Sequence, residues 1–599
     1  MLRIALLLAG VSLLPAATVS KPQRLEYTLR VDPADLSGIA VELRVRAAPA
    51  GLRLAAHAHP EYDDEYWRHV EDLRATTGGG EAVSVTRADS SVWSLANPAG
   101  DVVVRYRVRF PREEGARAAW RPFLSPAGGL VGGPHSFLYV IGQEEAAASV
   151  ALELPAGWKV ASGLSGPPTA RRFDARDLHT LMESPLLVGE LRQWTFRVRD
   201  VPHRVFYWPL PNAAPFDSVA FVRGIERLAT EAVNLFGGMP YEEYTFLIQD
   251  GASSGGLEHP NSVTLGALSA ELARDPHAGL PEIAHEFVHT WNLMAIKPAE
   301  YRKVDYRVQP PVAGLWFSEG LTLFYADLLQ RRAGLPVQDS TRIAKLEGLI
   351  ARYLSAPGNA RYSAEEVSRV AYNATPAALG DYTASTHLQG ELIGTVLDLL
   401  VRDSTDGERS IDDVMRLMYG RFTDRGFIGR DVQTAVNEVC GCRVDAFFDA
   451  HVRRGDSIAF DRYLRAIGLR VTTTWQPAMR ADGQPAVDLR MWGYQQGNEP
   501  FIRLRVGDPR SVWGTAGLRT GDRLVSGKGA AIRTWPELRS FLASLAVDDT
   551  VSIVVHRDGG PVTTRVVMRG HDRPVVRIEP VEDASPRQRR LREAWLAGR

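Results

Sequence analysis

The sequence has little cysteine, no long apolar run after its N-terminal segment, and almost no net charge. Cys440 and Cys442 are the only cysteines among 599 residues, so the fold cannot depend on a disulfide framework. No later stretch approaches the roughly 18 uninterrupted apolar residues that a membrane-spanning helix needs. A formal net charge of −1 gives no attraction toward nucleic acid or an anionic membrane. We therefore expect a folded, multidomain protein that binds neither of them.

The N-terminus has the order of a secretory signal peptide. Arg3 precedes an apolar run from Ile4 to Leu14, and small residues follow Pro15. The run is too short to span a bilayer, and no cysteine lies directly after it, where a lipid would be attached. We expect a signal peptide over residues 1–20, a secreted or periplasmic product, and no membrane contact after cleavage. The alternative is a buried N-terminal helix.

The most informative motif is His-Glu-Phe-Val-His at 285–289. On a helix, residues i and i+4 project from one face, so His285 and His289 can bind one zinc ion. Glu286 lies beside them, where it can take a proton from water as a general base. Glu319, in an apolar helix-like stretch thirty positions later, would be the third ligand and leave a fourth position open. The alternative is that these are ordinary packed or surface histidines.

A second motif, Gly-Gly-Leu-Glu-His, occupies positions 255–259. A glycine-rich segment beside a zinc cleft can run as an edge strand and pair with the backbone of a peptide substrate. Gly255 and Gly256 would then contact the substrate, and Glu258 could hold its free α-ammonium group. Such a contact would fix the position of cleavage relative to the substrate's N-terminus, as in an aminopeptidase. The alternative is a plain turn with a solvated glutamate.

Together with Trp-Phe-Ser-Glu-Gly at 316–320, these motifs resemble the glycyl aminopeptidase family. Its members are zinc enzymes with a thermolysin-like catalytic domain and a C-terminal PDZ domain, and the resemblance covers residues from about 25 to about 570. At the matching positions it implies one zinc ion and the ligand, base and amine-anchor roles given above. It also implies a preference for small N-terminal residues such as glycine or alanine.

One segment departs from the family pattern. Family members carry two tyrosines before a Lys-Gly-Glu-like stretch, where this chain reads Ser-Thr-His-Leu-Gln-Gly-Glu at 385–391. A tyrosine there would donate a hydrogen bond to the oxygen that becomes negative during hydrolysis, and losing such a donor costs about 10²–10³ in rate. His387 could replace it, and Tyr382 is close enough in sequence to be a rival. Either could instead be an ordinary loop residue.

Hydrophobic periodicity divides the chain into domains. Alternating apolar and polar residues predict an N-terminal β-sandwich over 21–205. Helical spacing dominates 206–480, which we expect to be the thermolysin-like α+β zinc peptidase domain. The order of strands and helix over 485–572, with Gly-Leu-Arg-Thr-Gly-Asp at 517–522, resembles a bacterial PDZ domain. We expect a C-terminal tail over 573–599.

The PDZ groove could accept an extended peptide as an added strand. Gly497-Asn498-Glu499-Pro500, however, matches a carboxylate-binding loop poorly. A structural or substrate-presenting role for this domain is therefore an equal alternative to peptide binding.

The sequence supports three functions. The first is a secreted zinc aminopeptidase that hydrolyses the N-terminal peptide bond of peptides with a free amine. The second is a zinc endopeptidase of the same fold. The third is a catalytically weak PDZ adaptor, which the missing tyrosines favour and the complete ligand set disfavours.

Overall fold

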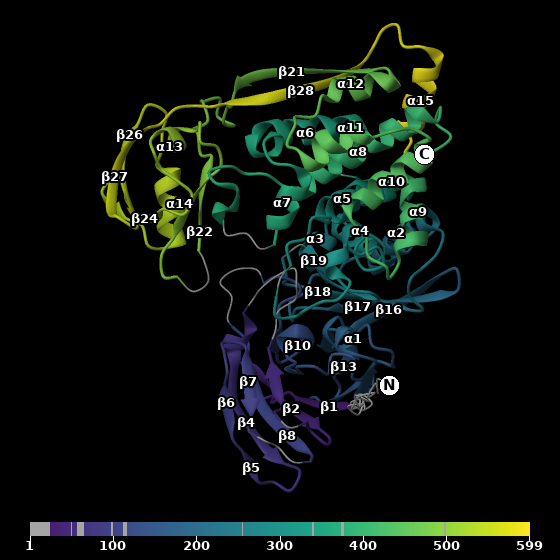
Figure 1. Cartoon of the computed structure of the whole chain (residues 1–599), viewed down its shortest axis with the longest axis vertical. Helices are drawn as coiled ribbons and strands as arrows, with labels where there is room; N and C mark the ends of the chain where they lie inside the picture. Colours follow the sequence, from purple (N-terminus) through teal and green to yellow (C-terminus); the bar gives the residue numbers. More distant parts are fainter. Residues whose placement is uncertain are drawn as a thin grey trace, which may run out of the picture.

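The computed structural model describes residues 24–49, 51–56, 65–96, 100–111, 117–253, 255–308, 310–337, 341–372, 376–495 and 499–599. The predicted signal peptide lies outside the described residues, as do Gly497 and Asn498 of the poorly matching loop. The described chain forms an N-terminal β-rich part, a central sheet covered by helices, and a C-terminal β-rich part (Figure 1). None of the helices in these ranges is both long and apolar enough to cross a bilayer.

The N-terminal part consists of three antiparallel or mixed sheets that share one large hydrophobic core. Leu130, Ala161 and Leu187 instead form a smaller cluster with residues of the central sheet. The seven-stranded sheet has the order β14 (Arg172–Ala175), β12 (Ala148–Glu153), β1 (Leu25–Arg30), β2 (Gly38–Val45), β8 (Val102–Arg109), β4 (Val70–Thr77), β5 (Ala82–Val83). The two four-stranded sheets are β13 (Lys159–Ala161), β15 (Leu186–Gly189), β10 (Gly128–Val131), β9 (Phe123–Ser125), and β11 (Tyr139–Val140), β3 (Arg53–Ala55), β7 (Val92–Leu95), β6 (Val85–Arg87). In β1 and β8, apolar residues face the core while alternate polar residues face away from it, and the three sheets confirm a β-rich N-terminal part.

The central part is built on a five-stranded sheet. Its order is β16 (Arg192–Val198), β17 (Val201–Trp208), β18 (Tyr244–Gln249), β20 (Ser262–Gly266), β19 (Gly255–Glu258). The predicted domain limit at residue 205 falls inside β17, which pairs with β16 on one side and with β18 on the other. β19 pairs only with β20 and forms one edge of the sheet.

Helices cover this sheet and share one core with it. The longer ones are α2 (Ser218–Phe236), α4 (Leu280–His289), α5 (Leu315–Arg332), α6 (Arg342–Ser355), α7 (Ala364–Val370), α8 (Thr386–Ser404), α9 (Ile411–Phe422) and α10 (Gly429–Cys440). α5 is buried on nearly every side, as expected of a helix that is apolar all round and lies inside a helical layer. At the end of α10, Cys440 and Cys442 form a disulfide.

The C-terminal part has its own sheet and core. The strand order is β22 (Met491–Tyr494), β23 (Arg503–Val506), β24 (Arg523–Gly527), β26 (Thr550–Arg557), β27 (Gly560–Val567), with β25 (Ala530–Ala531) paired to β24 and the helices α13 (Val512–Thr515) and α14 (Trp535–Ala543) beside it. The strands and α14 follow one another in the order expected from the sequence.

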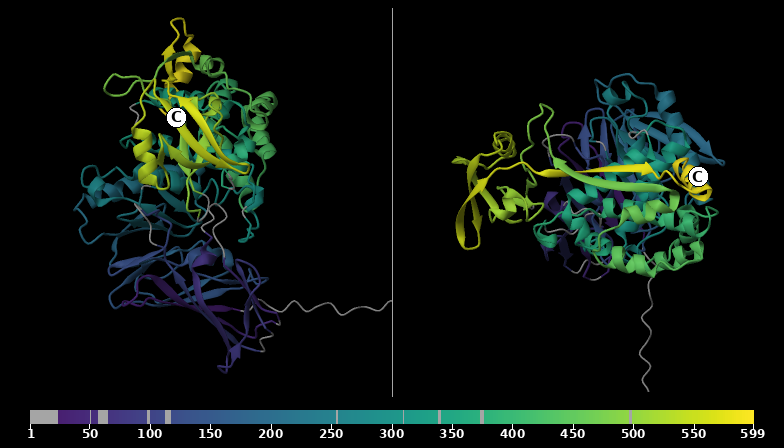
Figure 2. Two further views of the ribbon diagram at one scale, coloured as in Figure 1. Left: turned by 90° about the vertical axis from the view of Figure 1, so that its left-hand side faces the viewer. Right: turned by 90° about the horizontal axis from the view of Figure 1, so that it is seen from above.

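A two-stranded ribbon joins this part to the helices. β21 (Leu469–Pro477) leaves the central part, and β28 (Asp572–Pro580) returns antiparallel to it and leads to α15 (Pro586–Leu596) (Figure 2). Trp595 of α15 is 1% exposed and lies 4.3 Å below the Arg342 guanidinium, while Arg587 pairs with Asp403 of α8 at 2.7 Å. The segment predicted as a tail is thus a strand and a helix that pack on the central part.

Candidate active site

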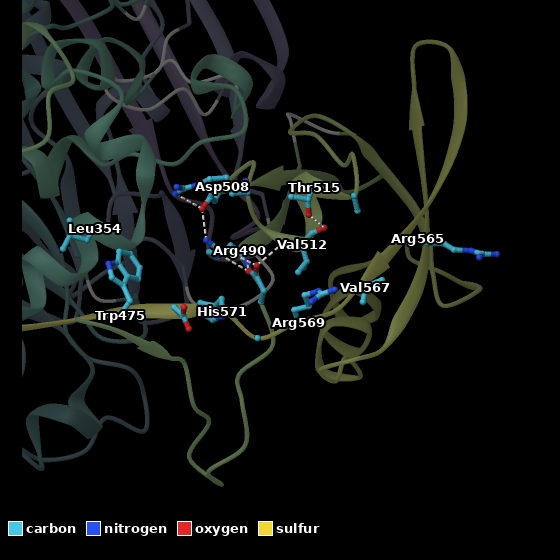
Figure 3. A pocket seen from close by; sticks show the side chains of 15 residues that line it. Leu354, Trp475, Arg490, Asp508, Val512, Thr515, Arg565, Val567, Arg569 and His571 are labelled. Atoms are coloured by element: carbon cyan, nitrogen blue, oxygen red, sulfur yellow. Dashed lines mark hydrogen bonds and ion pairs between the residues drawn. The ribbon is translucent and has the colours of Figure 1, made fainter. Parts of the chain in front are cut away.

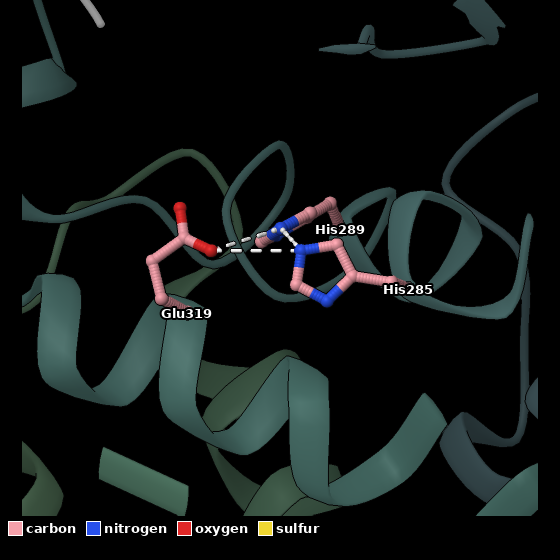
Figure 4. Close-up of side chains that lie close together, drawn as sticks. All are labelled: His285, His289 and Glu319. Carbon is pink, nitrogen blue, oxygen red and sulfur yellow. Dashed lines mark hydrogen bonds and ion pairs between the residues drawn. The ribbon is translucent and has the colours of Figure 1, made fainter. Parts of the chain in front are cut away.

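Two helices bring the three predicted ligands together. His285 and His289 lie on α4 and Glu319 lies in the second turn of α5 (Figure 4). The two histidine Nε2 atoms are 3.1 Å apart, and Glu319 Oε2 lies 3.7 Å from that of His285 and 3.4 Å from that of His289. The side chains of His289 and Glu319 are almost completely buried.

This geometry fits a zinc ion. Zinc–ligand bonds of about 2.0–2.1 Å in a tetrahedron place two ligand atoms roughly 3.3 Å apart, within the range of the three distances above. The Nδ1 atom of His289 lies 3.0 Å from the carbonyl oxygen of Asn292, which can only accept a hydrogen bond. Nδ1 therefore carries the proton, and the lone pair of Nε2 faces the ligand cluster.

Asn292 also connects the two ligand-bearing helices. Its side-chain amide donates to the carbonyl oxygens of Phe317 (3.1 Å) and Ser318 (2.9 Å) and to the hydroxyl of Thr322 (3.2 Å). Asn292 is fully buried, so these bonds fix the turn after α4 against the start of α5. Sequence reasoning missed this residue; a lone polar side chain in an apolar run after the histidine motif was the only available signal.

The buried charges of the cluster shift one another's pKa values. Burial, together with the carboxylate of Glu258, raises the pKa of Glu286 well above its usual range. Burial opposes charge on Glu319, but His289 and His387 hold its pKa well below the usual range. Burial alone would lower the pKa of His289. The nearby carboxylates, chiefly that of Glu319, outweigh burial and raise this pKa to about 10.

The edge strand β19 presents its residues to α4 in alternation. A Cβ at Gly256 would lie 2.6 Å from Cγ of Glu286, so only glycine lets this side chain approach the strand. Glu258, two residues on, is 4% exposed, and its carboxylate, that of Glu286 and a nitrogen of His289 lie within 4.8 Å of one another. Its Oε1 atom has no hydrogen-bond partner among the described residues. Gly255 has a φ of +126°, which favours glycine.

His387 lies at the ligand cluster and Tyr382 does not. His387 begins the first turn of α8, and its Nε2 atom is 3.1 Å from Oε2 of Glu319. The ring of Tyr382 instead lies 4.8 Å from the guanidinium of Arg361, and none of its contacts with described residues reaches the cluster. Tyr372, which no sequence motif singles out, donates a hydrogen bond from its hydroxyl to Oε1 of Glu319.

His387 lines two cavities. The larger, of about 690 Å³, is lined by His285 and Glu286 and by charged side chains of α5, α6 and α8. The smaller, of about 230 Å³, is lined by Tyr372 and by Arg505 of β23. The larger volume is within the range of clefts that bind small ligands, and its position places a bound peptide against the ligand cluster.

The histidine pair on one helix, the glutamate on the next and the adjoining cleft define a zinc-dependent metallopeptidase. Residues 26–190 match the model of the Peptidase M61 N-terminal domain, and residues 280–393 match the model of M61 glycyl aminopeptidase. The chain therefore carries both domains of the M61 glycyl aminopeptidase family and is a zinc-dependent metalloaminopeptidase. The resemblance stated from the sequence is confirmed.

One solved structure shares this architecture. An aminopeptidase N family protein from Idiomarina loihiensis has 22% identity and a TM-score of 0.74, over 96% of this chain and 100% of its own, which shows a shared fold. An M1 zinc metallopeptidase from Deinococcus radiodurans, a mutant bound to a Tyr-Ser-Ala substrate, has 18% identity and a TM-score of 0.47 over 73% of this chain and 94% of its own. No curated protein matches the chain. Neither family model extends to 485–572, so the PDZ assignment stays a prediction.

Proposed function

We propose that this chain is a secreted aminopeptidase that uses Glu258 to hold the free α-ammonium group of its substrate. The observation that supports this role is a carboxylate oxygen of Glu258 that is buried beside Glu286 without a hydrogen-bond partner among the described residues. A buried, unpaired carboxylate is costly, and an arriving ammonium group would offset that cost. The edge position of β19 would let the substrate backbone pair with it at Gly255 and Gly256.

The proposed chemistry is hydrolysis of the first peptide bond. His285, His289 and Glu319 would hold one zinc ion, which, when bound, supplies Lewis-acid activation of water and of the carbonyl group. Glu286 would take a proton from the attacking water and deliver it to the leaving amine.

We assign His387 as the donor to the oxygen that becomes negative in the transition state. The imidazole of His387 lies against Oε2 of Glu319. Burial lowers the pKa of His387, but the carboxylate of Glu319 outweighs burial and raises it, so the ring can donate a hydrogen bond. The contacts of Tyr382 with Arg361 disfavour Tyr382 in this role. Tyr372 would hold Glu319 from the other carboxylate oxygen and so orient a metal ligand.

The remaining parts of the proposal depend on fewer observations. A preference for N-terminal glycine is supported by the description of the matched family, and we extend it to alanine, the next smallest residue. Secretion is supported by the residue order of 1–20. For the C-terminal part we propose a PDZ fold with a structural or substrate-presenting role. A Cβ at Gly493 of β22 would lie 2.6 Å from Leu538 and 3.0 Å from Trp535, so α14 packs directly on the strand that a peptide would join.

The test is the ratio of kcat/KM values for a free peptide and its N-acetylated form. Acetylation removes the charge that Glu258 would bind, so the wild-type enzyme should strongly prefer the free peptide. Glu258→Gln should reduce that ratio about 10- to 100-fold, because one hydrogen bond to a charged group is weakened. Glu271→Gln, an exposed change of the same kind on α3 (Ser269–Leu272), is the matched control. Equal cleavage of both peptides by the wild type would favour the endopeptidase alternative.

A further inference from the structure

The C-terminal part is fixed to the segment that leads into α8. The backbone N–H of Thr383 donates to the carbonyl of Gly507 at 3.2 Å, and the N–H of Thr520 donates to Oδ1 of Asp381 at 2.7 Å. Asp381 also pairs with Arg519 at 3.5 Å. These contacts lie four to six residues before His387, so the C-terminal part is positioned directly beside the candidate active site.

One side chain of the C-terminal part lines a cavity of that site. Arg505 on β23 forms part of the wall of the 230 Å³ cavity that also contains His387 and Tyr372. Most of the remaining wall consists of apolar side chains from α7 and from residues 378–386. Because His387 also lines the larger cleft, a peptide held at the ligand cluster can extend its C-terminal side toward Arg505.

Arg505 has no carboxylate partner among the described residues. It is half-buried, its Nε atom is buried without an acceptor, and its guanidinium lies 5.5 Å from the centre of the Trp492 ring. Burial lowers its pKa, which reflects the cost of an uncompensated charge. One other arginine of the same part differs. Arg490, in the 710 Å³ cavity on another side of this part, is paired with two aspartates, Asp488 and Asp508 (Figure 3).

We propose that Arg505 binds the C-terminal carboxylate of short peptides whose N-terminal residue is held at Glu258. The inference rests on the proposed aminopeptidase function and extends it to substrate class. A guanidinium presents two parallel N–H groups to a carboxylate, and a partly dry, mostly apolar cavity strengthens that contact. Since His387 lines both cavities, the carboxylate must lie within a few residues of the cleaved bond. The C-terminal part thereby selects short peptides over long ones.

The experiment compares three substrates that share an N-terminal Ala-Ala sequence: Ala-Ala-Ala, its C-terminal amide, and Ala-Ala-Glu amide. For the wild-type enzyme, kcat/KM should be about 10- to 100-fold higher for the free acid than for the amide, the effect of one charge-assisted contact. Arg505→Met, which keeps an unbranched apolar stem near Trp492, should bring that ratio close to one. Arg510→Met removes a charge that lines the other cavity and should leave the ratio at the wild-type value.

Each other outcome is decisive. A wild-type ratio near one would overturn the proposal without any variant. If Ala-Ala-Glu amide were cleaved as well as the free acid and Arg505→Met removed this advantage, Arg505 would bind an acidic side chain, and its assignment to the C-terminal carboxylate would be wrong. An alanyl chromogenic amide, which has no carboxylate, reports activity separately. If neither this amide nor any peptide were hydrolysed, the proposed function would be wrong, and the role of Arg505, which rests on it, would be wrong too.

Discussion

Gly256 provides a quantitative test of how the general base is positioned. In Gly256→Ala the new methyl group would lie 2.6 Å from Cγ of Glu286 and 2.7 Å from the carbonyl oxygen of Thr264. Ordinary contact begins near 3.4 Å, so Glu286 must retreat by roughly 0.8 Å or the edge strand must move away. A displacement of about 1 Å at a catalytic group can cost on the order of 10² in rate. We expect kcat to fall about 100-fold while zinc content stays at the wild-type value.

The assay needs kcat, zinc per chain and the melting temperature of the same preparation. Gly420→Ala is the control, because a methyl group there meets no atom within 4 Å on α9 and removes a flexible helix residue. It should leave kcat unaltered and stabilise the fold by about 0.5–1 kcal/mol. If Gly256→Ala kept wild-type kcat, close packing against β19 would not hold Glu286 in place, and the account of the strand would be wrong.

Three further substitutions test the assigned roles. Glu286→Gln should keep zinc bound but lower kcat about 10²–10⁴-fold, because the ligands remain and the base is lost; near-normal turnover of the zinc-loaded variant would refute the mechanism. Glu319→Ala should lose zinc on dialysis, measured by elemental analysis, and full occupancy would show that the third ligand is misassigned. His387→Ala should lower kcat about 10²–10³-fold with little change in KM, whereas Tyr382→Phe should change neither. An unaltered kcat in His387→Ala would leave the oxyanion donor unidentified.

Local sequence signals were sufficient to predict that His285, His289 and Glu319 lie together. The spacing of His285 and His289 determines their shared helix face, and an apolar helix around Glu319 supplies the partner surface. The contacts of Asn292 could not be predicted, because they depend on which turn of α5 meets α4 in space. The contact of Tyr372 depends on how the chain after α7 meets α5. The choice between His387 and Tyr382 likewise depended on the path of the segment before α8, which five residues of sequence do not determine.

The fold shows the same distinction between local pattern and long-range pairing. Alternation identified the N-terminal strands correctly, but it does not tell whether β17 joins the preceding sandwich or the central sheet. In the structure, Leu591 and Trp595, four residues apart, bury one face of α15, and Arg587 pairs with Asp403. These contacts need a partner surface nearly two hundred residues away, which sequence periodicity cannot supply.

The most direct test of the central claim is reconstitution of the metal-free enzyme with zinc, followed by mass spectrometry of its products. The account predicts that about one zinc ion per chain restores activity. A free peptide should then lose its N-terminal residue first, while the N-acetylated peptide stays intact. Internal fragments from the acetylated peptide would contradict the assignment of Glu258 as the amine anchor. Activity that is independent of zinc would contradict the assignment of His285, His289 and Glu319 as its ligands.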